Sequence, residues 1–228
     1  MNLMFFFRNV ILIVFFIGSD VQAFQIDSLT KVIDKDTQYI EITGEYEREY
    51  IYTQLTQLLT DKKHGLREIP FNPEDISSWP VIVEPGEIVL DKADKIRVRI
   101  IRNGPQQDED RVSGLAFIPE KVHGKKIQDS GLQISVGYKV WLFIPGKSPL
   151  KGQIKASKKS GNITIENMTN KILRIVPDDC LEKNKSECVG AIILLPQASK
   201  QIDNSEHVHT LSIYLINDLH KKIKVITL

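Results

Sequence analysis

The sequence predicts an all-β protein that folds as two β-sandwich domains. From residue 24 onward, apolar residues recur with period two or in short solid runs, and clusters of turn residues separate them at strand-like spacing. The chain has 228 residues, of which 42% are hydrophobic and 26% are charged. This composition supplies enough apolar surface for one large or two small cores, and it excludes a disordered or collagen-like chain.

Residues 1–23 are typical of a secretory signal peptide. Arg8 precedes the apolar block Val10–Ile17, and small residues close the segment at Ala23. The block is far shorter than the roughly 20 residues that a membrane-spanning helix needs. We therefore expect cleavage after Ala23 and a mature chain, starting at Phe24, that lies outside the cytoplasm without membrane insertion.

The first sandwich is predicted over residues 24–146. Breaker clusters at residues 70–75, 84–86 and 103–105 separate its candidate strands. About seven short strands in roughly 120 residues fit an immunoglobulin-like sandwich. The clearest candidates are Gln38 to Thr43, Glu49 to Leu58, Lys95 to Arg102, Ser113 to Ile118 and Leu132 to Ile144.

A second, smaller sandwich is predicted over residues 147–228. The segment Pro145 to Pro149 contains two prolines and a glycine, a composition typical of a stiff connector between domains. The candidate strands beyond it are Asn162 to Ile165, Ile172 to Val176, Val189 to Leu195, Thr210 to Ile216 and Ile223 to Leu228.

Two cysteines, Cys180 and Cys188, flank a polar loop between two apolar runs. They are too few for a zinc site, and their spacing is wider than that of a redox pair. In an oxidising compartment they can form one disulfide that staples a hairpin. The sequence leaves open whether they are bridged.

The residues offer no support for an enzyme, a cofactor or a metal site. His207 and His209 share a strand face but lack further ligands at metal-site spacing, so we expect exposed strand-edge histidines. Asp108 to Asp110 precede Arg111, which predicts a solvated loop with a local ion pair. The formal net charge of +1 provides no overall field that would attract nucleic acid.

Alternating apolar residues mark the segment before the longest apolar run. In an extended strand, one face of this segment carries Leu132, Ile134, Val136 and Tyr138. The pattern permits two interpretations: a strand that covers its own sandwich, or an edge strand that pairs with another chain.

Several segments, in this order and spacing, resemble periplasmic chaperones of the chaperone–usher pilus pathway, and the departures from the common pattern favour its alternate branch. The first resembles the family's Thr-Arg-Val-Ile strand, and the last its Ile-Asn-Asp signature. The segments are Leu29 to Ile33, Lys95 to Ile100, Asp110 to Ser113, Phe117 to Pro119, Leu132 to Pro145, Glu166 to Thr169 and Tyr214 to Asp218.

The resemblance implies two immunoglobulin-like domains set at an angle and a periplasmic chaperone without enzymatic activity. Leu132, Ile134, Val136 and Tyr138 would then complete a fimbrial subunit as a donor strand, and the complex would pass to an outer-membrane usher. A dimer that caps the edge of the free protein is compatible with this reading.

The resemblance also implies a cleft with two cations that bind the subunit's terminal carboxylate. Lys31 falls at the family's arginine position, but Trp141 stands at the lysine position, and the nearest cation is Lys139. Arg97, Arg99 or Arg111 could substitute for it, or the subunit's terminus could be bound in a different way. The alternative interpretation of both lysines is that they are solvated strand residues.

A different class of protein remains a rival: a secreted structural or adhesive component of a surface fibre. A fibre subunit would be expected to carry a spare donor segment before its first strand. Here the segment Gln25 to Ile33 already has strand character within two residues of the predicted cleavage point.

Overall fold

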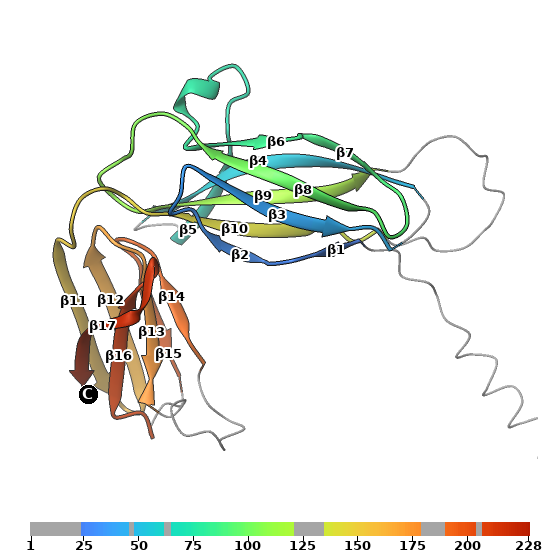
Figure 1. Ribbon diagram of the computed structural model, residues 1–228. Coiled ribbons are helices and arrows are strands. Elements are labelled where there is room, and N and C mark those ends of the chain that lie inside the picture. Colours follow the sequence, from blue (N-terminus) through green and yellow to red (C-terminus); the bar gives the residue numbers. More distant parts are fainter. Residues whose placement is uncertain (1–23, 46–47, 62–64, 121–134, 179–189, 204–206) are drawn as a thin grey trace, which may run out of the picture.

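The computed structural model describes residues 24–45, 48–61, 65–120, 135–178, 190–203 and 207–228. In this part of the chain the regular elements are strands, apart from the 3-10 turn η1 (Ile76–Ser78) and a 3-10 residue at Asp178. Strands β1 to β10 form one group and β11 to β17 another, and the two groups meet at one end with their long axes at an angle (Figure 1). The predicted all-β, two-sandwich, angled fold is confirmed.

The first group consists of two facing sheets. One contains, in spatial order, β1 (Gln25–Ile26), β3 (Thr37–Thr43), β8 (Lys95–Arg102) and β6 (Val81–Glu84). The other contains β2 (Thr30–Val32), β10 (Tyr138–Ile144), β9 (Arg111–Glu120), β4 (Glu49–Asp61) and β5 (Gly65–Pro70), with β7 (Glu87–Leu90) also paired to β4. The pairing of β2 with β10 is parallel, and the other pairings in both sheets are antiparallel.

The second group also consists of two sheets. One contains β11 (Gly152–Lys159), β12 (Asn162–Thr169) and β15 (Ser199–Ile202). The other contains β14 (Ile192–Leu194), β13 (Leu173–Pro177), β16 (Thr210–Leu215) and β17 (Asp218–Thr227). Its core is a separate cluster of buried aliphatic side chains that includes Ile163, Ile175 and Ile213.

Period-two alternation sets the register of the first sandwich. Ile40 in β3 lies opposite Val98 in β8, and both side chains are fully buried. Leu115 and Leu142 face them from the other sheet in the same core cluster. Each such side chain contributes roughly 1.5–3 kcal/mol on burial, so a slip of one residue would expose the whole set and be strongly disfavoured.

One predicted strand needs correction. The run Leu132 to Ile144 was expected to form one continuous strand, but β10 begins at Tyr138 and residues 136–137 carry no strand pairing. Leu132 and Ile134 lie outside the described residues. Gly137 leaves little room for a side chain, because a Cβ there would lie 2.7 Å from the Phe117 carbonyl oxygen.

A buried ion pair joins the two groups of strands. Lys171 Nζ lies 3.0 Å from Asp110 Oδ1, with side-chain exposures of 7% and 1%. Asp110 also accepts hydrogen bonds from the backbone N–H groups of Gly146 and Ile172, both at 2.8 Å. The expectation of a solvated loop is therefore wrong for Asp110, whose partner lies 61 positions away in the sequence.

An apolar cluster supports this ion pair. Val112 and Phe143 from the first group pack with Ile172, Leu195 and Ile216 from the second. These five buried apolar side chains form one cluster with members from both sandwiches, so the two sandwiches are in direct contact.

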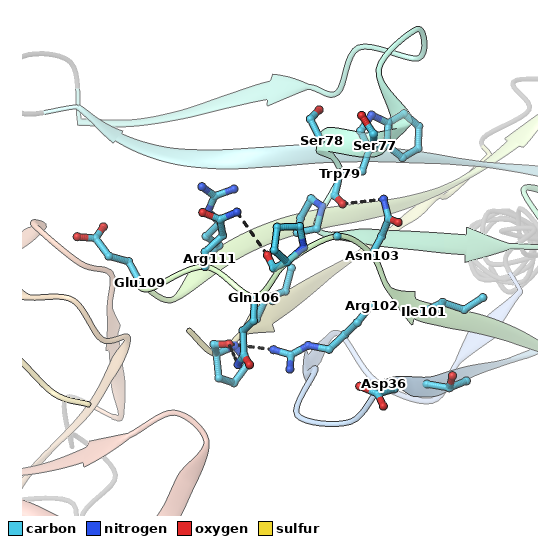
Figure 2. A pocket seen from close by; sticks show the side chains of 17 residues that line it. Asp36, Ser77, Ser78, Trp79, Ile101, Arg102, Asn103, Gln106, Glu109 and Arg111 are labelled. Atoms are coloured by element: carbon cyan, nitrogen blue, oxygen red, sulfur yellow. Dashed lines mark hydrogen bonds between the residues drawn. The ribbon is translucent and has the colours of Figure 1, made fainter. Parts of the chain in front are cut away.

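The connector between the sandwiches is held by both of them. Lys171 Nζ donates to the Gly146 carbonyl, and a Cβ at Gly146 would lie 2.5 Å from the Asp108 carbonyl oxygen. Arg102 and Gln106 donate to the Pro145 carbonyl, and all three residues line a cavity of about 650 Å³ (Figure 2). The predicted boundary between residues 146 and 147 falls in this connector and remains a prediction.

Candidate functional site

Strand β10 has an open edge. On one side it pairs with β9 along its whole length, whereas on the other side the described pairing is with β2, at Trp141–Phe143. Within the described residues, no strand pairs with Tyr138–Val140 on that second side. An unpaired strand edge presents backbone N–H and C=O groups that can extend the sheet with another chain.

The side chains of β10 alternate between the core and the outer face of the sheet. Val140 and Leu142 are fully buried in the first core. Tyr138 packs against the same core, with its ring edge-on to Phe24 at a centroid distance of 5.1 Å. Val136, two positions before β10, is half-buried. In this structure Tyr138 is therefore half-buried against the protein's own core.

The structure does not bring the two predicted cleft lysines together. Lys31 is in register with core-facing Leu142, and its ammonium donates to the Tyr39 carbonyl on the facing sheet and lies 3.7 Å from Asp27. Lys139 alternates with core-facing Val140 and thus projects from the outer face. The role of either lysine in binding remains a prediction.

Two of the alternative cations also have partners elsewhere. Arg97 and Arg99 belong to β8 of the other sheet, where Arg97 Nε lies 3.4 Å from Glu41 and Arg99 pairs with Glu84. Arg111 begins β9 and lines the cavity beside the connector (Figure 2). Lys139 is thus the candidate cation that projects from β10 itself.

The partner of Lys139 is a residue that sequence reasoning missed. Lys139 Nζ lies 2.5 Å from Glu68 Oε1 and 5.6 Å from the centroid of the Trp141 ring. Thr56 donates to the same oxygen of Glu68. Burial alone would raise the pKa of the Glu68 carboxyl, but the hydrogen bonds from Lys139 and Thr56 outweigh burial and lower that pKa below its ordinary value.

Glycine makes room for this cluster. Gly114 lies on β9 between Thr56 on β4 and Trp141 on β10. A Cβ at Gly114 would lie 2.6 Å from Thr56 Oγ1, 3.0 Å from Glu68 Oε1 and 3.2 Å from Trp141 Cζ3. The missing side chain of Gly114 therefore leaves a space over β9, here called the hollow, that side chains from three other strands fill.

Strand β5, which carries Glu68, gave little signal in the sequence. All six of its residues are exposed, so no alternation of buried and exposed positions marks it. The available sequence signals for this strand were Gly65 at its start and Pro70 at its end, since both residue types are common at the ends of short edge strands.

The cluster lies directly above the contact between the two sandwiches. Val112, Leu58 and Phe143, which pack against the second group, sit two positions along β9, β4 and β10 from Gly114, Thr56 and Trp141. The site therefore lies beside the contact between the two groups, on the outer face of the sheet that contains β10.

Other predicted features lie outside the described residues or have no counterpart within them. Cys180 and Cys188 lie outside the described residues. In the part of the chain that is described, no group of three or more His, Cys, Asp or Glu side chains is placed to hold a metal ion. Among the same residues, no helix is long and apolar enough to cross a membrane.

The fold matches solved fimbrial chaperones. The crystal structure of the class 5 fimbriae chaperone CfaA aligns with a TM-score of 0.59 and 16% identity, covering 90% of this chain and 98% of that one. A chain from the Salmonella enterica complex of SafA pilin with SafB chaperone aligns with a TM-score of 0.59 and 11% identity, covering 92% and 99%. The protein therefore has the two-domain immunoglobulin-like fold of these chaperones.

Sequence comparison gives the family. Residues 26–145 match the family described as CS5 fimbrial protein N-terminal domain, and the chain belongs to this family. An Escherichia coli relative, the uncharacterized 25.9 kDa protein in the CS5 3' region, is 30% identical over 199 residues, covering 85% of this chain and 88% of the relative. The resemblance to fimbrial chaperones inferred from the sequence is thereby confirmed.

Proposed function

We propose that this protein is a periplasmic chaperone that captures fimbrial subunits by donor-strand complementation and delivers them to an outer-membrane usher. The open edge of β10, which the alternating segment Leu132 to Tyr138 precedes in the sequence, is the observation that carries the proposal. The family and the shared fold support it. A subunit that lacks one strand would pair with this edge and gain the missing ladder of backbone hydrogen bonds.

Leu132, Ile134 and Val136 are the proposed donor side chains. Burial in a subunit groove would contribute roughly 1.5–3 kcal/mol for each, before the cost of ordering the segment. Tyr138 completes the predicted set, but its contact with Phe24 ties it to the protein's own core. The donor role therefore rests on the first three.

The remaining predictions belong to the same proposal. Residues 1–23 would direct export to the periplasm, and a Cys180–Cys188 bridge would form there. Lys31 and Lys139 would contact the bound subunit from opposite faces of the sheet rather than as one clamp. A dimer that covers the edge of β10 would protect the free protein from aggregation.

Capture of a subunit tests the proposal directly. Tagged protein is expressed in its native periplasm, and the co-purified proteins are identified and weighed by mass spectrometry. We expect a small β-rich secreted protein in 1:1 ratio. Ile134→Asp should reduce its recovery at least tenfold, because the loss of one buried Ile side chain alone accounts for about 1.5–3 kcal/mol.

Gln133→Asp is the matched control, since it adds the same charge on the opposite face of the alternating segment. It should leave recovery of the subunit nearly unchanged. Recovery of the wild-type protein as long polymers of itself would instead identify a fibre component. Unfolding of Ile134→Asp would place that side chain in the internal core and contradict the donor role.

A further inference from the structure

The hollow over Gly114 already holds a carboxylate. Glu68 Oε1 receives the ammonium of Lys139 at 2.5 Å and the hydroxyl of Thr56, which also lies 3.3 Å from the Gly114 carbonyl oxygen. Thr56 is 7% exposed, so the hydroxyl end of the site is largely shielded from water. The chain itself thus demonstrates which ligand chemistry the hollow accepts: a carboxylate.

Glu68 can leave this position without disturbing a core. It belongs to β5, which lies at the end of its sheet, and all six residues of β5 are exposed. The side chains of Lys139 and Glu68 are 36% and 30% exposed. Exposed ion pairs contribute at most about 1 kcal/mol, so the contact can be exchanged at small cost.

We propose that Glu68 is an internal competitor that occupies, in the free protein, a carboxylate site formed by Lys139 and Thr56, and that a carboxylate of a bound subunit displaces it. This inference rests on the proposed chaperone function. Glu68 would then have a regulatory role. Its carboxylate neutralises Lys139 until a subunit binds, and it lowers the affinity for the subunit by competing for the same two hydrogen-bond donors.

Electrostatics explains why displacement is required. A second carboxylate that approached Lys139 while Glu68 remained would face a like charge within a few ångströms, which opposes binding. Once Glu68 swings toward solvent, the incoming carboxylate inherits both charge-assisted donors. Competition of this kind suits a complex that must later release its subunit.

Peptide binding to the full mature chain tests the inference. The probes are three acetylated octapeptides of alternating apolar and polar residues: one with a free carboxyl terminus, one amidated, and one amidated with aspartate as its last residue. The reporter is the indole NMR signal of Trp141, assigned by comparison with Trp79→Phe, since the chain has two tryptophans. Trp141 lies beside Lys139 and so senses the site.

We expect Glu68→Gln to tighten binding of the free-acid peptide about fivefold and to leave the amidated peptide unchanged. Lys139→Met should abolish the difference between these two peptides. If the aspartate peptide gains as much as the free acid, the site accepts a side-chain carboxylate as well as a terminal one. Glu41→Gln is the matched control, because Glu41 forms an exposed pair with Arg97 on the other sheet.

Equal tightening of the acid and the amide by Glu68→Gln would overturn the competitor role, and so would the absence of any tightening or of any peptide shift of Trp141. None of these outcomes touches the proposed function, which stands or falls with co-purification of a subunit. If wild-type protein captures a subunit while Glu68→Gln leaves peptide affinity unchanged, the chaperone proposal survives and the competitor does not.

Discussion

Two ion pairs in this protein use the same chemistry in opposite settings. Lys171 and Asp110 lie 3.0 Å apart with side-chain exposures of 7% and 1%, at the joint between the sandwiches. Lys139 and Glu68 lie 2.5 Å apart with exposures of 36% and 30%, on the sheet face above that joint. Burial, rather than distance, separates a pair that fixes structure from a pair that can exchange partners.

The difference follows from solvation. Two buried charges tolerate their loss of water only because each has the other and further hydrogen bonds, so removal of one leaves an uncompensated charge. Two exposed charges return to water when they part. Substitutions in the buried pair should therefore destabilise the protein strongly, whereas substitutions in the exposed pair Lys139–Glu68 should change its stability little.

Asp110→Ala gives the largest expected effect. Without Asp110, the Lys171 ammonium loses its counter-ion and two backbone N–H groups lose their acceptor. We therefore expect destabilisation by about 3–5 kcal/mol. Urea unfolding followed by circular dichroism measures it. Asp108→Ala, two positions earlier and exposed, is the control and should change stability by less than about 0.5 kcal/mol. Equal effects of both substitutions would remove the distinction between buried and exposed carboxylates.

Gly114→Ala should have an intermediate effect. The new methyl would meet Thr56 Oγ1 at 2.6 Å and Glu68 Oε1 at 3.0 Å, so side chains over β9 must shift, at a cost of about 1–3 kcal/mol. The same unfolding measurement applies. Gly86→Ala is the control, because its nearest neighbour would be Thr53 Oγ1 at an ordinary 3.8 Å. A neutral Gly114→Ala would mean that Glu68 already moves freely from the hollow.

Prediction from sequence succeeds for the strands of the first sandwich. The strands of the first core follow from alternation: Lys95 to Arg102 was predicted and observed with the same bounds. The predicted strand Gln38 to Thr43 lacks only the first residue of the observed strand, Thr37. Such strands can be recognised in a sequence because each buried side chain adds an apolar residue to the period-two pattern, whichever residue it packs against.

The ion pairs could not be predicted in the same way. Asp110 and Lys171 are 61 residues apart in the sequence, and Lys139 and Glu68 are 71 residues apart. No local sequence pattern can therefore predict either contact. Asp110 looked like its exposed neighbours Asp108 and Glu109 because a carboxylate is usually solvated. Glu68 was missed together with β5, because a strand exposed along its whole length has no alternation to detect.

Of these substitutions, Glu68→Gln should change the free energy of unfolding least. The pH dependence of that change tests the exposed ion pair most directly. The pKa of Glu68 is lowered by its bonds from Lys139 and Thr56 despite burial, so its contribution is present above the ordinary pKa of 4.5 and is lost as the pH falls through the folded-state pKa. At neutral pH we expect wild type to exceed Glu68→Gln by at most about 1 kcal/mol. The two unfolding free energies should converge once the pH falls below the folded-state pKa of Glu68.

A double-mutant cycle with Lys139→Met separates the ion pair from other effects of the amide. In the Lys139→Met background, Glu68→Gln should have little remaining effect at neutral pH, because the carboxylate has lost its main cationic partner. A difference between wild type and Glu68→Gln that persists unchanged at acid pH would show that the amide perturbs packing rather than charge. The exposed pair would then be as structural as the buried one, and the contrast between the two settings would fail.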